Sequence, residues 1–543
     1  MSMRLRIIYI STMLLAIANT AVAQVPRNDT VIKGSTIEIV QSYKPEVKQV
    51  PKPEMLPGLP PADTARPTFK YEVPAQTLTY TYSAQPLRPL ALAKDTANQP
   101  FPDYLKLGAG NLSTIYLDAG IGMLKGKDYS SAIHLHHLSQ KGSLANQQTS
   151  LSGLEADGNL HIKHMQWHAG LDVERSRYGF YGYDHDSVTF ANTDSLKQVY
   201  TGIRLRVDMH NDGKADDKFD YAPSINASYY GDKFTASETT FGFNLPATYN
   251  INEYLHLSLA VAGDFTQYKV GNVYAFPNKL IRITPGIQYQ NQYFSAHAYL
   301  SPAFGETNYF LPDIAVSFMI PKTQLAIKAG WLGSVARNTF EQLTTENPYM
   351  FNLYSWHQSH TNEVYAGIQS NIGQHIYFTG KLSWWQFKSL PLFLNDSADM
   401  KQFYIVYDTL HAISLQASIR YLLSNTFSVG FSTAWYKYSG GTQAQVWHVP
   451  TATFKGDFNL RPIPQLTING YISVLNNIHA VDKYKNDVKL DDIIDLGVGA
   501  EYLFIRRLSA FVQVNNILGN DYQRWLGYPS YGINIYGGLR LKF

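Results

Sequence analysis

The residues best suited to catalysis are four consecutive ones, Asp184-His185-Asp186-Ser187. They include a nucleophile, a base and an acid, the residue types of a hydrolytic triad. A triad is a spatial arrangement, however, and neighbours in a sequence rarely converge on one reacting atom. The chain also lacks a G-x-S-x-G motif, which would hold a serine on a sharp strand-to-helix turn. We therefore predict no enzymatic activity, and a membrane-embedded hydrolase stays a third hypothesis.

Six histidines are the candidates for a metal site: His134, His136, His137, His161, His164 and His168. Residues 134 and 136 would share one face of a β-strand, because strand side chains alternate between two faces. A metal site needs its ligand atoms at about 2 Å from the ion, and spacing in a sequence cannot show such convergence. We interpret these histidines as polar residues that line an interior or turns. The prediction is no metal site and no cofactor.

Aromatic residues make up 14% of the chain and include 39 tyrosines. Aromatics that face an interior, such as Tyr377 and Trp385, would form a platform for stacking on sugars. The alternative is an aromatic belt, since tyrosine and tryptophan concentrate where a membrane meets water. Trp384 and Trp385 must point to opposite faces of one strand, so only one of them can face lipid. Three aromatics near a strand end suit such a belt: Trp435, Tyr436 and Tyr438.

The strongest structural pattern lies at the end of the chain. Apolar residues recur there at every second or fourth position: Ile533, Ile535, Leu539, Leu541 and Phe543. Polar residues stand between them, including Arg540 and Lys542. A period of two indicates a β-strand with one apolar face and one polar face. We expect this strand to close a membrane barrel and to act in its assembly, with the terminal aromatic at the membrane boundary.

Earlier segments repeat the same alternation, for example at 255–262, 376–385 and 466–473. Tight connections are expected at 163–164, 250–253, 290–292, 321–322, 373–374, 423–425, 461–464 and 506–507, and long ones at about 179–196, 338–360, 389–402, 478–490 and 517–530. In the C-terminal half, tight and long connections mostly alternate along the chain. Short periplasmic turns and long outer loops alternate in the same way in outer-membrane barrels. The sequence thus predicts an all-β protein, a transmembrane antiparallel β-barrel of about 20–22 strands over residues 103–543.

The first hundred residues have a different composition. Residues 1–23 read as a signal peptide, with two arginines before an apolar stretch and a small-residue cleavage site. Residues 24–102 hold half of the chain's 26 prolines and are expected to form a flexible periplasmic arm. Within the arm, one β-prone peptide is a candidate for binding a partner's sheet edge, or it is ordinary linker: Thr36, Ile37, Glu38, Ile39 and Val40.

Charge and cysteine content exclude several classes of function. The net charge of +3 is too small to indicate a nucleic-acid partner. The absence of cysteine excludes thiolate metal sites and cysteine nucleophiles. Charged residues are only 16% of the chain, against about 25% in soluble domains, which favours a membrane environment. The expected partner is therefore outer-membrane lipid.

The C-terminal residues also resemble a known family. The run Val514-Asn515-Asn516-Ile517-Leu518, then Tyr522, Trp525, Gly527-Tyr528-Pro529 and the closing GGLRLKF, is similar to the end of TonB-dependent receptors. The resemblance implies a 22-stranded outer-membrane barrel, coupling to an inner-membrane motor and uptake of large, scarce ligands. Those receptors carry a folded plug before the barrel. The 79 proline-rich residues at 24–102 depart from the family at this point, so we carry over neither a plug nor any ligand-binding residue.

A barrel of this width without a plug would leak, because a 22-stranded lumen is normally filled. We therefore expect an occluder: outer loops that fold inward, the 24–102 arm, or a partner protein. The predicted function is transport, either uptake or a channel. The alternative is a non-transporting scaffold subunit of a multi-protein outer-membrane assembly, tethered through the N-terminal arm.

Overall fold

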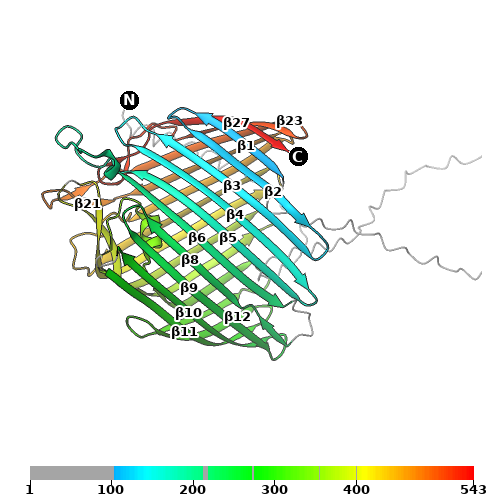
Figure 1. Ribbon diagram of the computed structural model, residues 1–543. Helices are drawn as coiled ribbons and strands as arrows, with labels where there is room; N and C mark the ends of the chain where they lie inside the picture. Colours follow the sequence, from blue (N-terminus) through cyan, green and yellow to red (C-terminus); the bar gives the residue numbers. More distant parts are fainter. Residues whose placement is uncertain (1–102, 212–217, 272–273, 354, 399) are drawn as a thin grey trace, which may run out of the picture. The chain divides into compact units, whose positions relative to one another are not determined.

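The wall of the molecule is a closed antiparallel sheet (Figure 1). The computed structural model describes residues 103–211, 218–271, 274–353, 355–398 and 400–543, and these form a barrel of 22 strands. The first strand, β1 (Tyr104–Gly110), pairs with β2 (Ile115–Lys125) on one side and with the last strand, β27 (Asn534–Lys542), on the other. The predicted fold class and the upper strand number are confirmed. No helix in the described residues is long and apolar enough to cross a membrane.

The other wall strands follow one another in chain order. They are β3 (Tyr129–Lys141), β4 (Gln148–Ile162), β5 (Met165–Gly179), β6 (Lys197–Asn211), β8 (Ser224–Asp232), β9 (Ala236–Asn250), β10 (Leu255–Val270), β11 (Tyr274–Gln290), β12 (Phe294–Phe304), β13 (Tyr309–Met319), β14 (Leu325–Ala336), β15 (Ser359–Ile372), β16 (Ile376–Asn395), β17 (Phe403–Leu423), β18 (Phe427–Ser439), β19 (Ala452–Ile463), β20 (Leu466–Asn476), β23 (Ile493–Ile505) and β24 (Leu508–Asn515). The short β7 (Phe219–Tyr221) pairs with the same neighbour as β8, namely β9. It therefore occupies the same position in the wall as β8 and is not counted as a separate wall strand.

The connections separate the barrel into a turn end and a loop end. The eight tight connections expected above lie at the turn end, together with Tyr104 and Phe543, whereas the short bends that the sequence shows at Gly110-Asn111 and Gly231-Asp232 lie at the loop end and are exceptions to the rule. The expected loops lie at the opposite end. By the rule that outer-membrane barrels keep their short turns in the periplasm, the loop end faces outward from the cell.

Several loop predictions needed correction. The expected loop at 389–402 is shorter, because β16 continues to Asn395 and β17 begins at Phe403. A loop at 440–451 was missed. Secondary structure inside the loops was missed as well: η1 (Thr193–Leu196), α2 (Phe340–Glu346), β21 (His479–Val481), β22 (Asp487–Lys489), β25 (Gln523–Trp525) and β26 (Tyr528–Pro529). A period-two pattern gives no signal for such short elements, because tertiary contacts stabilise them.

The outward face of the wall is apolar and the inward face is polar. On β17, Ile413 and Leu415 are about half exposed, whereas Ser414 between them is fully buried. On β27, Leu539 and Leu541 are exposed in the same way. Isolated in water, such a surface would be unstable, so it is the surface that lipid covers.

The aromatic belt interpretation holds for only part of its residues. Trp384 and Trp435 are on the exposed outward face. Tyr436 and Tyr438 instead face the interior, where their rings stack at 5.7 Å between centroids and the Tyr436 hydroxyl accepts a hydrogen bond of 2.9 Å from Gln416. These two tyrosines were assigned wrongly because a run of aromatics in a strand must alternate between lipid and lumen.

Inside the barrel, charged residues cross the seam where β1 meets β27. Glu501 of β23 lies 3.3 Å from Arg540 of β27 and 3.7 Å from Lys106 of β1. The Arg540 guanidinium also lies 4.6 Å from the centre of the Tyr104 ring, and the Tyr104 hydroxyl donates to Asp118 of β2. Side chains of four strands therefore hold β1 and β27 together on the face that points into the lumen.

The facing of the last strand yields a direct test. We expect Leu539→Asp to lower the amount of folded, membrane-inserted protein, because a carboxylate on the lipid face costs on the order of 1–3 kcal/mol. The control is Lys542→Asp, which introduces the same residue on the same strand but on the inward face. The measurement is heat-modifiable mobility of the protein in isolated outer membranes. Equal folded amounts of both variants would contradict the assigned facing.

Candidate functional site

Three loops rooted at well-separated places around the wall meet over the barrel. Loop 180–196 joins β5 to β6, loop 337–358 joins β14 to β15, and loop 516–533 joins β24 to β27. In the described wall, eight strands separate the first root from the second, eight the second from the third, and six the third from the first. The roots are thus spaced roughly by thirds. Loops with such roots can touch one another only above the lumen.

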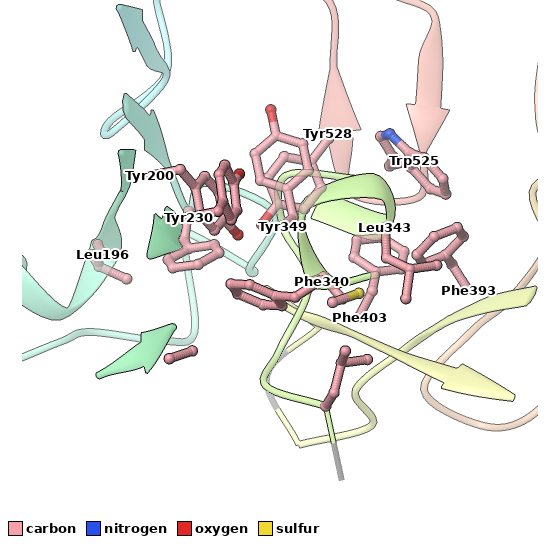
Figure 2. Close-up of a cluster of buried hydrophobic side chains, with 14 of the residues drawn as sticks. Leu196, Tyr200, Tyr230, Phe340, Leu343, Tyr349, Phe393, Phe403, Trp525 and Tyr528 are labelled. Atoms are coloured by element: carbon pink, nitrogen blue, oxygen red, sulfur yellow. The ribbon is translucent and has the colours of Figure 1, made fainter. Parts of the chain in front are cut away.

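Each of these loops contributes one tyrosine to their meeting point, and we call Tyr181, Tyr349 and Tyr528 the tyrosine triad. The rings of Tyr349 and Tyr528 are stacked, with centroids 3.6 Å apart (Figure 2). Tyr181 meets Tyr528 edge-on at 4.8 Å and Tyr349 at 6.1 Å. All three side chains are buried. The three loops together form what we call the lid.

The tyrosine triad is part of the largest buried apolar cluster in the described residues. Its members come from the lid and from the loop ends of the wall strands: Phe180, Tyr181, Leu196, Tyr200, Tyr230, Ala236, Tyr268, Phe340, Leu343, Tyr349, Met350, Leu353, Phe393, Phe403, Trp525 and Tyr528. Figure 2 shows Tyr200 and Tyr230 on one side of Tyr349 and Tyr528, and Trp525 and Phe393 on the other. A membrane barrel has no such core within its wall, so this cluster is an additional core at the loop end of the barrel.

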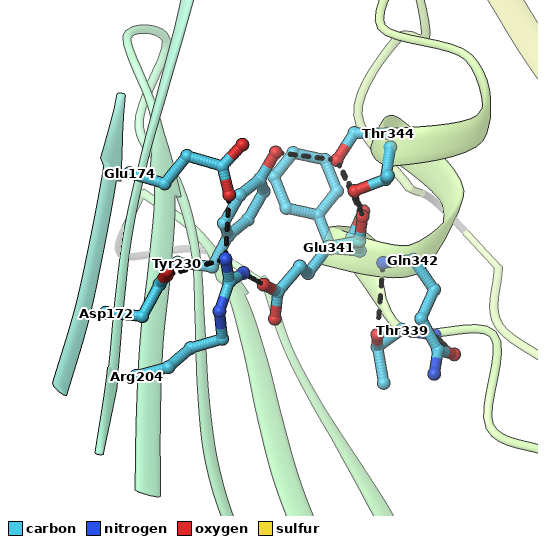
Figure 3. Close-up of polar contacts among 10 residues, drawn as sticks. Asp172, Glu174, Arg204, Tyr230, Thr339, Glu341, Gln342 and Thr344 are labelled. Atoms are coloured by element: carbon cyan, nitrogen blue, oxygen red, sulfur yellow. Dashed lines mark hydrogen bonds and ion pairs between the residues drawn. The ribbon is translucent and has the colours of Figure 1, made fainter. Parts of the chain in front are cut away.

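Helix α2 anchors loop 337–358 to the opposite wall. The helix starts at a capping box, in which the Thr339 hydroxyl accepts from the Gln342 backbone and the Gln342 amide accepts from the Thr339 backbone. Arg204 of β6 binds Glu341 of the helix and also lies 2.7 Å from Asp172 and from Glu174 (Figure 3). This ion cluster fixes the helix against strands β5 and β6.

Hydrogen bonds reinforce the same contact. The Tyr230 and Thr344 hydroxyls are 3.0 Å apart, and the Tyr200 hydroxyl donates to the Pro348 carbonyl at 3.0 Å. The buried carboxylate of Glu238 on β9 accepts the Phe340 backbone N–H at 2.6 Å. Every buried polar group named here therefore has a partner, which an apolar cluster requires of its polar members.

Loop 516–533 is fixed by one of its side chains and by its backbone. The Tyr528 hydroxyl donates to the Lys401 carbonyl, and the Asn395 amide donates to the Leu526 carbonyl at 3.0 Å. Gly527 has a φ of +88°, and a Cβ there would lie 2.6 Å from the Gly182 carbonyl oxygen. Only glycine permits this approach between loops 516–533 and 180–196.

A buried histidine links the lid to loop 440–451. His448 is 1% exposed; its Nδ1 lies 2.9 Å from the Phe393 carbonyl, and its Nε2 lies 3.3 Å from the Leu526 backbone N–H. One neutral tautomer satisfies both contacts, with Nδ1–H donating and Nε2 accepting. Burial lowers the pKa of His448 to about 4, and the nearby Arg524 guanidinium acts in the same direction.

A recess of about 470 Å³ opens on the inner wall across β14 to β19. Three lysines line it, Lys328, Lys381 and Lys455, together with Tyr365 and several hydroxyl and amide groups. No carboxylate belongs to the lining, although Lys381 pairs with Glu363 at 2.6 Å. The recess has the residue types for binding an anionic or hydroxyl-rich molecule.

The candidates for a hydrolytic triad, residues 184–187, do not converge on one point. The Ser187 hydroxyl donates to Asp184 at 2.6 Å, whereas His185 Nε2 lies 3.0 Å from the Tyr181 carbonyl and its ring packs on Tyr183. The histidine and the serine thus have different partners, and the four residues form a hydrogen-bonded turn at the edge of the lid.

The histidine group separates into several places. His134 and His136 lie together on the inner face of β3, with ring centroids 5.6 Å apart. His168 lies between two carboxylates on the wall, and His137 faces outward, 2.8 Å from the Ser152 hydroxyl. His161 and His164 lie at the β4–β5 turn.

The two predicted peptide sites have different outcomes. Ile535, Leu539 and Leu541 are exposed on β27, with Ile533 and Phe543 just outside that strand, and their role in assembly stays a prediction. The peptide Thr36–Val40 lies outside the described residues, as do the signal peptide and the 24–102 arm. Outer loops that fold inward were among the expected occluders, but Tyr181, Tyr349 and Tyr528 were not predicted to meet, although all three fall in segments expected to be long loops.

Removing one ring of the tyrosine triad should open the lid and leave the wall intact. Truncating a buried aromatic to alanine costs about 3–5 kcal/mol, and here the loss falls on loops alone. We expect Tyr528→Ala to speed cleavage of the loops by external proteinase K about tenfold or more, with unchanged heat-modifiable mobility. Tyr484→Ala is the matched control, an exposed tyrosine in another outer loop. Equal cleavage of the two variants would count against a packed lid.

The lid should also loosen in acid. Because the pKa of His448 is lower in the folded lid than the value near 6.5 in an unfolded loop, its contribution is complete above pH 6.5. That contribution is lost as the pH falls from about 6.5 to about 4, up to roughly 3 kcal/mol. Proteinase sensitivity measured across this range should rise more in the wild type than in His448→Gln, whose amide can donate and accept without titrating. Equal profiles of the two proteins would contradict this role.

No protein-family model and no curated protein matches the sequence. Solved structures do match. A mutant of the ferric enterobactin receptor PfeA from Pseudomonas aeruginosa has 9% identity and a TM-score of 0.61, covering 81% of this chain and 80% of that chain. The FrpB iron transporter from Neisseria meningitidis has 11% identity and a TM-score of 0.64, covering 82% of each chain. The siderophore receptor PirA from Acinetobacter baumannii has 10% identity and a TM-score of 0.62, covering 81% and 80%.

At identities of 9–11%, these likenesses establish the fold and not the ligand. They extend over the whole wall rather than over the last thirty residues alone. The resemblance to the barrel of TonB-dependent receptors is therefore confirmed as one of fold, and the described residues form a barrel of that type.

Proposed function

We propose that the protein is an outer-membrane uptake barrel whose lid is the gate for the solute. The observation that carries the proposal is the contact of the tyrosine triad between three loops rooted about a third of the wall apart. A 22-stranded lumen is wide enough to need an occluder. Loops packed on one another can open locally without disturbing the hydrogen-bonded wall, which makes them suited to gating.

In this proposal the lid does what a plug does in other barrels of 22 strands, and residues 24–102 form a periplasmic arm rather than a plug. Receptors for ferric enterobactin and siderophores, and an iron transporter, have a similar barrel, which supports passage of a solute as the class of function. The ligand is not carried over from them. The lysine-lined recess on β14 to β19 favours an anionic or hydroxyl-rich solute once the lid has opened.

A reversible lock on the lid tests the gate. The chain has no cysteine, so Tyr349→Cys with Tyr528→Cys introduces a unique pair where two rings now stack at 3.6 Å. We expect planar-bilayer conductance to be low for the wild type, higher for Tyr528→Ala and lowest for the oxidised cysteine pair. Reduction of the disulfide should restore gating. The single variant Tyr349→Cys, treated with the same oxidant, is the control.

Two outcomes would contradict the proposal. A large conductance that is always open in the wild type would mean that the lid does not occlude the lumen. Conductance that is the same in the oxidised and reduced pair would mean that the lid does not gate. With either result, stoichiometric partners that co-purify and are lost on deletion of residues 24–102 would favour the alternative, a scaffold subunit tethered through the arm.

A further inference from the structure

The inner wall near the barrel seam brings together a set of side chains that the sequence could not place. His134 and His136 lie on β3, Glu155 lies on the neighbouring β4, and Asp118 lies on β2 on the other side (Figure 1 shows the three strands adjacent). In register, His134 is opposite Glu155 and His136 is opposite Asp118. Because paired residues of antiparallel strands share a face, all four side chains point into the lumen.

Three of these residues have possible ligand atoms that lie close to one another. One atom each from His134, His136 and Glu155 lies within 4.8 Å of the others, the single such set in the described part of the chain. Ligands around a tetrahedral Zn²⁺ at 2.0–2.1 Å are about 3.3 Å apart. Small side-chain rotations therefore suffice to close the set around an ion. Two imidazoles and one carboxylate are donors that suit divalent first-row transition metals and leave a position for water.

The fourth residue has the geometry of a supporting group. His134 Nε2 lies 3.3 Å from Asp118 Oδ1, while Nδ1 of the same ring lies 3.6 Å from Glu155 Oε2. Asp118 also accepts hydrogen bonds from the Tyr104 and Tyr116 hydroxyls. A carboxylate that binds the distal nitrogen of a histidine fixes the ring and its tautomer, as the supporting carboxylate does at zinc sites.

The backbone also makes room for the second ring. Gly153 of β4 is opposite His136, and a Cβ at that position would lie 2.2 Å from His136 Cε1. A larger residue would push the ring away from the β4 side, where Glu155 lies two residues along the same face. The absence of a side chain at 153 thus allows the histidine to lie against the strand that supplies the carboxylate.

We propose that His134, His136 and Glu155 form a binding site for a divalent transition-metal ion on the lumen wall, with Asp118 as the positioning residue for His134. The site links β3 to β4 two strands from the seam, so the bound ion adds a crosslink to this part of the wall. The site is independent of the lid and does not depend on the proposed gating function.

The test is titration of the purified full-length protein with ZnCl₂ by isothermal calorimetry, after chelator treatment and without a histidine tag. We expect one ion per chain. His136→Ala and Glu155→Gln should abolish this binding, and Asp118→Asn should weaken it about 10–100-fold. His137→Ala is the matched control, since it removes the next histidine on the same strand but from the outward face. Bound zinc should show imidazole nitrogen in its X-ray absorption spectrum.

Each variant must keep the heat-modifiable mobility of the folded barrel, and His136→Gln replaces His136→Ala if the latter does not fold. Failure of the wild type to bind Zn²⁺ at micromolar concentrations would overturn the proposal. So would binding that survives removal of His136, or binding that is lost equally in His137→Ala. None of these readouts involves conductance, so failure here is distinguishable from failure of the gate.

Discussion

Closure of the sheet between its first and last strands is the constraint on which the rest of the molecule depends. Within lipid, every backbone N–H and C=O must find a partner in the protein, so a spanning sheet cannot keep a free edge. Here β1 pairs with β27 along its whole length, with Leu105 opposite Leu541 and Leu107 opposite Leu539. The apolar faces of that pair meet lipid, and Lys106, Arg540 and Glu501 hold it from within.

The width of the closed wall then determines what the loops must do. Twenty-two described strands surround a lumen too wide for wall side chains to fill. In the proposed function the lid meets this need with aromatic residues, whose rings pack densely while their hydroxyls reach backbone carbonyls, as Tyr181 reaches Pro529 at 3.0 Å. Tyrosine suits such a position because its ring is apolar and its hydroxyl can form a hydrogen bond. The many tyrosines of the sequence are thus shared between this cluster, the lumen and the membrane boundary.

The polar side chains of the inner wall form three groups on different arcs of the barrel, that is, on different sets of strands. Arg204 and its carboxylates hold helix α2 at the loop end of β5 and β6. The lysine-lined recess lies on β14 to β19, and His134 with His136 lies on β3. These arcs share no side chain, so a change in one of them need not disturb the others. Anchoring of the lid and the proposed binding at the wall therefore depend on different residues of one barrel.

The sequence by itself determined the wall: the alternation at 255–262 and the run to Phe543 gave the strands, their facing and the positions of the tight turns. These follow from a local period of two, which each segment carries alone. The sequence did not determine that Tyr181, Tyr349 and Tyr528 meet, that α2 forms, or that His134 and His136 face Glu155. Those contacts depend on which strands are neighbours and where each loop is rooted, and only the closed sheet decides both.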